Sequence, residues 1–255
     1  MLSLQGRNAV VSGLANKRSI AWAIAQRLTD AGARLAITYQ NERLKEEARE
    51  LIASLPGAEG FQCDANNDAE IERLASDLKQ HYERIDVLVH CIAYALTEDL
   101  KGDFLNTSRE GFRVAQETSV YSLIALSRAV APMMTNGGSI MTLTYFGAEK
   151  VMPSYNVMGV AKAALEASVR YLAHSLGPQK IRVNAISAGP IKTLAARAVA
   201  GFSEMLKAQS ERAPLKRNIE PREVGDTALF LASDLSTGIT GETIYVDSGY
   251  NIMGF

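Results

Sequence analysis

The amino-acid sequence predicts an α/β fold in which a doubly wound parallel sheet is covered by helices on both faces. Short apolar segments alternate with longer amphipathic segments along the whole chain of 255 residues. The short segments are apolar almost throughout, which is typical of parallel strands buried on both faces. Since 47% of the residues are hydrophobic and no repeat or Pro/Ser-rich linker interrupts the pattern, residues 1–255 are expected to form a single domain.

Seven apolar segments are expected to be strands, and the amphipathic segments between them are expected to be right-handed helical crossovers. The strand segments are NAVVS (8–12), RLAITY (34–39), EGFQC (59–63), IDVLVHC (85–91), GSIMTLT (138–144), IRVNAIS (181–187) and ETIYVD (242–247). In such sheets a ligand lies outside the carboxyl ends of the strands, where the strand order reverses between the first and fourth strands. Gly13, Ile92 and Ala93 follow those two strands and are expected to meet there.

The charge and the cysteine and histidine content weigh against several classes of function. A formal net charge of −1 gives no general basic field for nucleic acid or anionic lipid. The start MLSLQGRNAVVSG lacks a secretory pattern and no apolar run reaches the length of a membrane span, so a soluble cytoplasmic protein is expected. Cys63 and Cys91 end apolar segments and are expected to be buried thiols, and the three histidines lack ligand spacing, so no metal is expected.

The segment after the first strand, SGLANKRSIAWAIAQRLTDAGA, is a candidate phosphate-binding loop. Gly13 opens the loop, and a helix is expected to begin near Ser19. The unpaired N–H groups and positive dipole end of that helix suit a pyrophosphate, and Ser19 can cap the helix or donate to phosphate. The loop lacks the pattern G-x-G-x-x-G, so an ordinary strand-to-helix turn is the alternative. Its place after the first strand favours a Rossmann-type dinucleotide site.

The ends of the second and third strands indicate where the adenosine part of a dinucleotide would lie. Gln40 stands where such folds usually carry an acidic residue that binds the ribose, and Asp64 follows the third strand, near the expected adenine. The neutral amide can bond ribose hydroxyls without repelling a 2′-phosphate, and Arg43 can attract one. Because no basic pair directly follows the second strand, NADH is expected to be preferred, with NADPH left open. Ordinary helix-capping residues are the alternative interpretation.

A tyrosine and a lysine lie seven residues apart at the start of the amphipathic segment 154–173, SYNVMGVAKAALEASVRYLA. Seven residues are about two helical turns, so Tyr155 and Lys162 point to nearly the same side, with Met158 between them. The fifth strand brings Tyr145 to the carboxyl edge of the sheet just before this helix. For an isolated pair, a tyrosine that anchors the helix start and a solvated lysine are the alternative.

These residues resemble the short-chain dehydrogenase/reductase family, and the resemblance covers essentially the whole chain, including IRVNAISAGPIKT (181–193) and ITGETIYVDSGY (239–250). The usual active site of that family has Tyr four residues before Lys and Ser thirteen residues before that Tyr, but here these positions hold Met158 and Tyr145. The spacing Tyr-x6-Lys, with Tyr145 upstream and a Gly-x5-Ser loop, resembles the bacterial enoyl-acyl-carrier-protein reductases. The resemblance implies reduction of trans-2-enoyl thioesters of acyl carrier protein by hydride transfer from NADH, in fatty-acid elongation.

The resemblance also implies roles for the candidate residues. Tyr155 would hydrogen-bond the developing enolate, Lys162 would hold the nicotinamide ribose and favour ionisation of the phenol, and Tyr145 would line the acyl pocket. Because hydride goes to C3 while charge collects on the thioester oxygen, moving the phenol by three helical positions, about 4.5 Å, can follow that oxygen. The expected cofactor-binding residues are Gly13, Ser19, Ile20, Gln40, Asp64, Ala65, Ile92, Lys162, Ile191, Lys192, Thr193, Leu194 and Ala195, and the expected substrate-binding residues are Ala95, Tyr145, Tyr155, Met158 and Phe202.

Two other functions remain open at this level. A carbonyl reductase of the same family, such as a 3-oxoacyl reductase, is disfavoured by Met158 at the usual tyrosine position. A non-catalytic protein that senses NAD(H) is disfavoured because Tyr155 and Lys162 are both present.

The resemblance further implies a homotetramer of 222 symmetry, with which the apolar segments 114–134 and 155–176 are compatible. Segment 193–216 follows Gly189 and Pro190 and is expected to be a mobile lid over the acyl pocket rather than a fixed helix pair, with Phe202 and Met205 as pocket walls. Basic residues on and beside it are expected to receive an acidic acyl carrier protein. They are Lys192, Arg197, Lys207, Arg212, Lys216 and Arg217.

Overall fold

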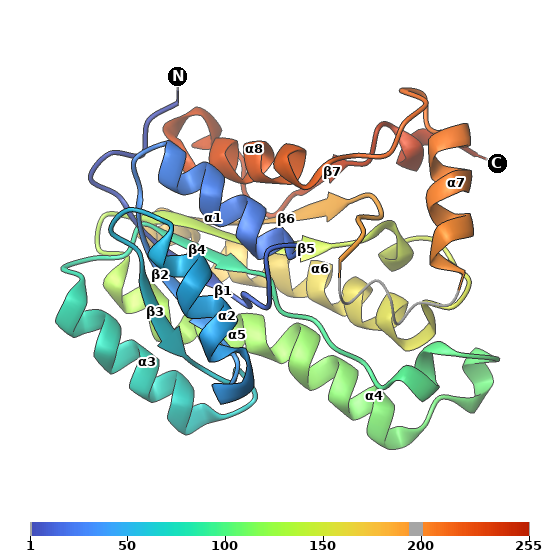
Figure 1. Cartoon of the computed structure of the whole chain (residues 1–255), viewed down its shortest axis with the longest axis horizontal. Helices are drawn as coiled ribbons and strands as arrows, with labels where there is room; N and C mark the ends of the chain where they lie inside the picture. The colour runs from blue at the N-terminus through green and yellow to red at the C-terminus, as the bar shows by residue number, and fades with distance from the viewer. Residues whose placement is uncertain (1, 194–200, 255) are drawn as a thin grey trace.

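The computed structural model describes residues 2–193 and 201–254, and in that part of the chain seven parallel strands form one sheet (Figure 1). The strands are β1 (Asn8–Ser12), β2 (Arg34–Tyr39), β3 (Glu59–Gln62), β4 (Val87–His90), β5 (Gly138–Thr144), β6 (Ile181–Ala188) and β7 (Thr243–Val246). Their order in the sheet is β3-β2-β1-β4-β5-β6-β7, and every neighbouring pair is parallel. The order therefore reverses between β1 and β4, which is where such sheets bind ligands.

The observed strands confirm the predicted doubly wound α/β fold. All seven expected segments form strands, and their ends differ from the expected ones by at most two residues, as where β4 begins at Val87 rather than at Ile85. The reversal between the first and fourth strands is also as predicted.

Helices cover both faces of this sheet, and successive strand residues point into two separate apolar cores. The helices are α1 (Ile20–Asp30), α2 (Glu42–Ala53), α3 (Asp68–His81), α4 (Arg109–Gln116), α5 (Ser122–Val130), α6 (Asn156–Leu176), α7 (Phe202–Arg212) and α8 (Pro221–Ala232). Val10 and Leu88 belong to one core, whereas Val11, Val87 and Val89 belong to the other. The strands are therefore continuously apolar because both of their faces are buried.

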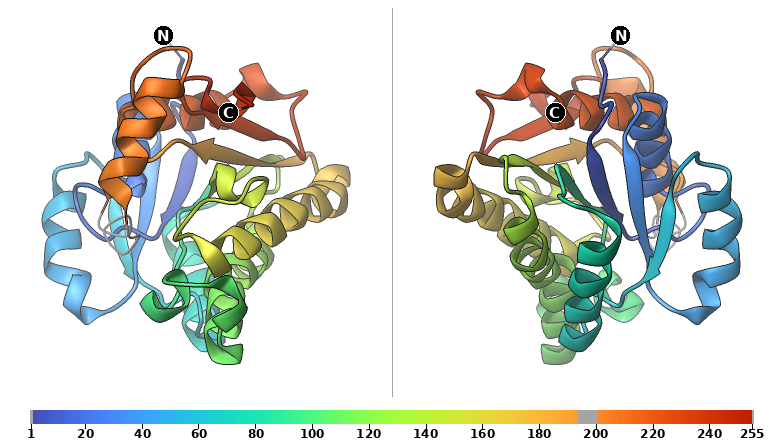
Figure 2. Two further views of the ribbon diagram at one scale, coloured as in Figure 1. Left: turned by 90° about the vertical axis from the view of Figure 1, so that its right-hand side faces the viewer. Right: turned by 90° about the vertical axis from the view of Figure 1, so that its left-hand side faces the viewer.

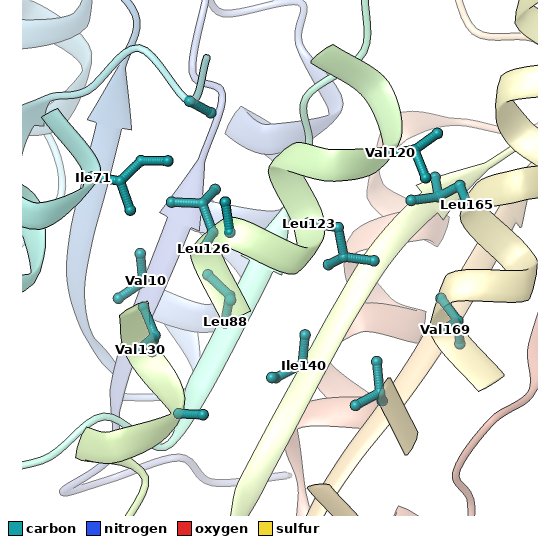
Figure 3. Packing of buried hydrophobic residues seen from close by; sticks show 14 of the residues in the cluster. Val10, Ile71, Leu88, Val120, Leu123, Leu126, Val130, Ile140, Leu165 and Val169 are labelled. Atoms are coloured by element: carbon teal, nitrogen blue, oxygen red, sulfur yellow. The ribbon is translucent and has the colours of Figure 1, made fainter. Parts of the chain in front are cut away.

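The first core lies under α3, α5 and α6, and the second lies under α1, α2 and α8 (Figure 2). In the first core, Val10, Leu88 and Ile140 of the sheet pack against helix residues such as Leu126 and Val169 (Figure 3). Each of these five side chains is at most 1% exposed, so each contributes about 1.5–3 kcal/mol through removal of apolar surface from water. The two cores make the sheet a rigid platform for the loops at its carboxyl edge.

Between α4 and α5 the chain forms a π-helix at Glu117–Tyr121. Such segments are rare and are often found at functional sites. Ser119, at its centre, is fully buried and bonds the backbone of Tyr94 in the loop after β4. The π-helix therefore fixes a loop that borders the reversal point of the sheet.

No helix in the described part of the chain is both long and apolar enough to cross a bilayer. Among the same residues, no group of three or more His, Cys, Asp and Glu side chains is arranged to hold a metal ion. Cys63 is a buried free thiol, as expected, whereas Cys91 is a free thiol in a residue that is only partly buried. Burial raises the pKa of both thiols to about 12, so both are protonated at neutral pH.

Candidate active site

A cavity of about 940 Å³ lies at the carboxyl edge of the sheet. Its walls come from the segments that follow β1 to β6, from α6 and from the start of α7. This volume is at the upper end of the range of roughly 300–1,000 Å³ that ligand pockets span. The cavity extends from Gln40 and Asp64 at one end to Tyr155 and Phe202 at the other, so it has the extent that a dinucleotide and a second ligand need.

The loop after β1 brings backbone close to the centre of this cavity. Gly13 has φ +88°, and a Cβ there would overlap with the carbonyl oxygen of Cys91. A helix begins directly after the loop, as predicted, with Ser19 as the N-cap of α1. The Ser19 hydroxyl donates to the Asn16 carbonyl at 2.7 Å and accepts from the Trp22 N–H at 3.2 Å. The capping role is therefore confirmed, and contact of Ser19 with phosphate stays a prediction.

The start of α1 is suited to an anion. Its first turn has no acidic residue, and its first N–H groups have no partner within the helix. The positive end of the helix dipole faces the same space. Gly13, Ser19 and Ile20 all line the cavity there, so the residues present fit the pyrophosphate of a dinucleotide.

The adenosine end of the cavity is formed by polar residues that follow β2 and β3. The Gln40 amide donates to a carboxylate oxygen of Asp64 at 3.4 Å, so the sheet brings together the two residues predicted from separate strand ends. Arg43 is exposed on α2, and the neighbouring Leu44 lines the cavity instead. Among the described residues that line the cavity, the basic ones are Arg113 and Lys162, which lie away from Gln40.

Nearly all of the predicted site residues that the structure describes line this one cavity. They are Gly13, Ser19, Ile20, Gln40, Asp64, Ala65, Ile92, Ala95, Tyr145, Tyr155, Met158, Lys162, Ile191, Thr193 and Phe202. Lys192 is the exception, because its side chain is exposed and is not part of the lining. Leu194 and Ala195 lie outside the described residues. The grouping supports the predicted site but does not by itself assign roles within it.

Tyr155 is the N-cap residue of α6, and its ring is held tightly by small neighbours. A Cβ atom at Gly147 would come within 2.6 Å of the Tyr155 ring. A Cβ atom at Gly159 would come within 2.8 Å of the Gly147 carbonyl oxygen. The ring of Tyr145 packs edge to face on it, with 5.0 Å between the ring centroids. Glycine at position 147 therefore leaves room for the Tyr155 ring, and glycine at position 159 leaves room for the Gly147 carbonyl beside it.

The backbone on both sides of Tyr155 is left-handed although neither neighbour is glycine. Ser154 has φ +61° and Asn156 has φ +36°. The Asn156 amide donates to the Gly102 carbonyl at 3.2 Å, which ties the start of α6 to the loop after β4. Strained conformations of this kind gather at functional sites, where the surrounding structure enforces them.

Lys162 lies two turns into α6 with its ammonium group against the end of β5. Its Nζ donates to the Leu143 carbonyl at 2.7 Å, and the residue is only 5% exposed. Burial lowers the pKa of Lys162, and the nearby Cys91 and Glu166 partly oppose this effect, so that the net pKa is about 8. The alternative of a solvated lysine is therefore wrong, and the ammonium is available inside the cavity to bond a ligand hydroxyl.

The phenol of Tyr155 is neutral at ordinary pH. Burial, followed by the neighbouring Tyr145, raises the pKa of Tyr155 above its usual value. The Lys162 ammonium points to the Leu143 carbonyl and is not among the groups that shift the pKa of Tyr155, so the role of Lys162 in favouring ionisation of this phenol stays a prediction. A neutral phenol of this kind can donate a hydrogen bond to an oxygen that gains negative charge.

The acyl end of the cavity is apolar apart from its phenols. Met158 is 6% exposed, and its sulfur lies 3.8 Å from the Ser119 hydroxyl. Ser119 accepts from the Tyr94 N–H at 3.0 Å and donates to the Tyr94 carbonyl at 3.1 Å, and so fixes the loop that carries Ala95. The Tyr145 hydroxyl donates to the sulfur of Met205 at 3.2 Å.

The predicted lid contains a formed helix. Segment 193–216 includes α7, whose buried Gln209 donates to the Asp247 carbonyl at 3.3 Å. Residues 202–212 therefore form one helix, in which Leu206 and Gln209 are buried. Phe202 and Met205 do line the cavity, as expected, and opening of the segment stays a prediction.

Sequence reasoning missed three residues that shape this site. Ser119 lies in the π-helix and bonds the Tyr94 backbone, and no sequence pattern predicts a π-helix here. Thr144 donates to a carboxylate oxygen of Glu166 at 2.6 Å beneath the lysine. A charged residue on the buried side of α6, one turn after Lys162, was the available signal for Glu166.

The fold and this site define a class of protein, a doubly wound α/β reductase in which a dinucleotide-type loop, a partly buried tyrosine and a buried lysine share one cavity. A family model described as "Enoyl-(Acyl carrier protein) reductase" matches residues 13–251. The chain belongs to this family, and the resemblance stated from the sequence is confirmed.

Similar proteins match over their full length. The enoyl-[acyl-carrier-protein] reductase [NADH] FabI of Bacillus subtilis is 56% identical over 252 residues, which are 98% of each chain. The crystal structure of the Bacillus cereus enoyl-acyl carrier protein reductase with NADP+ and indole naphthyridinone is 54% identical, covers 100% of both chains and has a TM-score of 0.98. The enzyme of Anaplasma phagocytophilum in complex with NAD is 43% identical over 100% of this chain and 97% of that chain, with a TM-score of 0.96.

Proposed function

We propose that this protein reduces trans-2-enoyl thioesters of acyl carrier protein to saturated acyl thioesters, with NADH as hydride donor, in fatty-acid elongation. The observation that carries the proposal is the joining, in one cavity, of a dinucleotide-type loop with a neutral phenol and an ammonium group at opposite ends of two turns of α6. The names of the similar proteins, which specify an enoyl thioester and NADH, support the same reaction.

Bound NADH supplies hydride to C3 of the enoyl group. The residues of this chain act on the rest of the reaction. As negative charge moves to the thioester oxygen, the Tyr155 hydroxyl donates a hydrogen bond to that oxygen and stabilises the enolate. Because the ring packs against Tyr145 and Gly147, the phenol is already oriented before the charge develops. A proton from solvent or from this phenol then completes the product at C2.

Lys162 positions the nicotinamide ribose rather than the substrate. Its Nζ is held by the Leu143 carbonyl, which uses one of the three N–H donors of the ammonium and leaves the others for ribose hydroxyls. With a pKa of about 8, Lys162 is mostly protonated at pH 7 and can act as such a donor. Ile92 and Lys162 line the same cavity as the apolar acyl end, so they would hold the nicotinamide of a bound cofactor beside the substrate.

The preference for NADH over NADPH follows from the adenosine end. Gln40 and Asp64 are bonded to each other there, and the Asp64 carboxylate repels a 2′-phosphate. The exposed Arg43 is not part of the lining and gives no fixed partner for that phosphate. One similar protein was nevertheless crystallised with NADP+, so both cofactors belong in the assay.

The rival function is reduction of a 3-oxoacyl thioester. In this chain Met158 occupies the position of the usual tyrosine. It is buried beside Ser119, and its thioether has no proton to donate to a ketone oxygen. The test is NADH consumption with crotonyl and with acetoacetyl thioester, side by side. Turnover of crotonyl thioester with little or none of acetoacetyl thioester supports the proposal, and the reverse order would refute it.

We also propose a cytoplasmic homotetramer that accepts its substrate from the carrier protein. Four large apolar side chains, Phe112, Tyr121, Val160 and Tyr171, are exposed on and between α4 and α6, where another subunit would cover them. Exposed basic residues near α7, including Lys207, Arg212 and Lys216, suit an acidic carrier. Light scattering that gives a monomer mass, or carrier-protein turnover that is insensitive to salt, would contradict the respective part.

A further inference from the structure

Two hydrogen bonds join α6 to the last two residues of β5. The Lys162 ammonium donates to the Leu143 carbonyl at 2.7 Å, and the Thr144 hydroxyl donates to the Glu166 carboxylate at 2.6 Å. Lys162 and Glu166 lie one helical turn apart, so the two bonds are successive rungs between the same helix and strand. All four residues are at most 9% exposed. Tyr145 follows directly after this pair of rungs.

Glu166 is a costly choice for a buried helix position. An apolar side chain would pack there without the desolvation cost of a carboxylate, and valine would replace Thr144 at similar volume. The bond of 2.6 Å has the length of a hydroxyl bonded to a charged oxygen. The presence of both polar groups points to a role beyond packing.

We propose that Thr144 and Glu166 are positioning residues, which lock one turn of α6 to the end of β5 and so keep the Lys162 ammonium against the Leu143 carbonyl, with the Glu166 carboxylate as a negative charge one helical turn away. This inference rests on the proposed function, since it assigns to the pair the task of presenting Lys162 to the nicotinamide ribose. Loss of the pair would let α6 shift against β5, and Lys162 and Tyr145 would shift with it.

The charges around both groups set the pH dependence. Lys162 is faced by Cys91 and His90 from β4 and by Glu166 from its own helix, while Leu143 of β5 contributes only a carbonyl. Glu166 is faced by Lys162 and Arg170 from α6 and by Glu149 from the segment before α6. Cys91 and, after it, Glu166 raise the pKa of Lys162 against the effect of burial. Removal of the Glu166 charge is therefore expected to lower the pKa of Lys162 further.

The test compares Thr144→Val, which removes the hydroxyl, with Thr144→Ser, which keeps it, and adds Glu166→Gln, which removes the charge. The dissociation constant of NADH is measured by fluorescence from pH 6 to 9.5, together with turnover of crotonyl thioester and thermal unfolding. Ser139→Ala is the matched control, because it removes a buried hydroxyl bond at the other end of β5, to the Leu231 carbonyl at 2.8 Å.

Thr144→Val is expected to weaken NADH binding about tenfold, with Thr144→Ser recovering most of the loss. In Glu166→Gln the pH at which NADH binding begins to weaken moves to lower pH. Ser139→Ala lowers the unfolding temperature without either effect. The inference would be overturned if the two Thr144 variants bound NADH equally well. It would also be overturned if NADH binding weakened at the same pH in Glu166→Gln as in the wild type. Absence of wild-type turnover with crotonyl thioester would instead refute the proposed function, and the binding comparison would still stand. If Thr144→Val fails to fold, Glu166→Gln alone decides.

Discussion

The two ends of the cavity are built in different ways. At the end formed by β1, β2 and β3, the ligand site consists largely of backbone and exposed polar groups, with Gly13 in a left-handed conformation and Gln40 at the rim. At the end formed by β5, α6 and α7, it consists of partly or fully buried side chains whose pKa values are shifted by desolvation, above all Tyr155 and Lys162. The first end can bind a ligand tightly without reacting with it, whereas the second has the perturbed groups that chemistry requires.

This contrast predicts that substitutions at the two ends change different kinetic quantities. Those at the backbone end should change cofactor affinity alone, and those at the side-chain end should change turnover, with cofactor affinity also changed where Lys162 or its positioning is affected. The four predictions below are ordered from the largest expected effect to the smallest.

Tyr155→Phe should lower kcat by several hundredfold, about 3–4 kcal/mol, because it removes the donor to the developing oxyanion. The dissociation constant of NADH should stay within about twofold, since the phenol acts on the substrate. Tyr82→Phe is the control, because it removes a buried phenol bond to the Leu35 carbonyl at 2.9 Å away from the cavity. Steady-state kinetics and NADH fluorescence distinguish the cases, and equal loss of NADH binding in Tyr155→Phe and Lys162→Ala would erase the contrast.

Lys162→Met should change how stability depends on pH. Folding lowers the pKa of Lys162 from 10.5 to about 8, so between pH 8 and 10.5 the unfolded chain binds more protons than the folded protein. The free energy of unfolding therefore rises with pH across this range. The wild type should gain about 3 kcal/mol relative to Lys162→Met between pH 8 and 10.5. Urea unfolding of both proteins at several pH values measures the difference. If the difference in free energy of unfolding between the two proteins were the same at every pH in this range, folding would not lower the pKa of Lys162.

Gly13→Ala should weaken NADH binding by about tenfold or more, because φ +88° strains alanine and its Cβ overlaps with the Cys91 carbonyl. At saturating NADH, kcat should change little. Gly57→Ala is the matched control, since Gly57 also has positive φ but nothing lies within 4 Å of an added Cβ. If both variants bind NADH equally well, the backbone end does not approach the cofactor at Gly13.

Gln40→Arg should improve NADPH relative to NADH by a few-fold, because a surface charge pair with the 2′-phosphate contributes about 1 kcal/mol or less. The ratio of kcat/KM for the two cofactors, at low and high salt, measures the change. The improvement should shrink at high salt, since the new pair is exposed. An unchanged ratio would place the adenosine ribose away from Gln40.

The same contrast explains which parts of the site could be predicted from the sequence. Gly13, Ser19 and the reversal between β1 and β4 follow from local patterns and from general rules of parallel sheets, so the backbone end was predictable. The spacing of Tyr155 and Lys162 is likewise a property of one helix, and their shared cavity is as predicted.

What could not be predicted depends on contacts between distant elements. The bond between Thr144 and Glu166 joins β5 to α6, and the two bonds of Ser119 need the π-helix. The Lys162 ammonium points toward the Leu143 carbonyl, and helical spacing alone does not reveal this direction. The anchoring of α7 by Gln209 is a contact of the same kind.

The most direct test of the account is to follow the transferred hydrogen. Crotonyl thioester is reduced with NADH that carries deuterium at the transferred position, in ordinary water, and the butyryl product is examined by NMR. The account predicts one deuterium at C3 and none at C2, because hydride goes to the carbon remote from the oxygen that Tyr155 stabilises. Deuterium at C2, or oxidation of NADH without deuterium in the product, would contradict it.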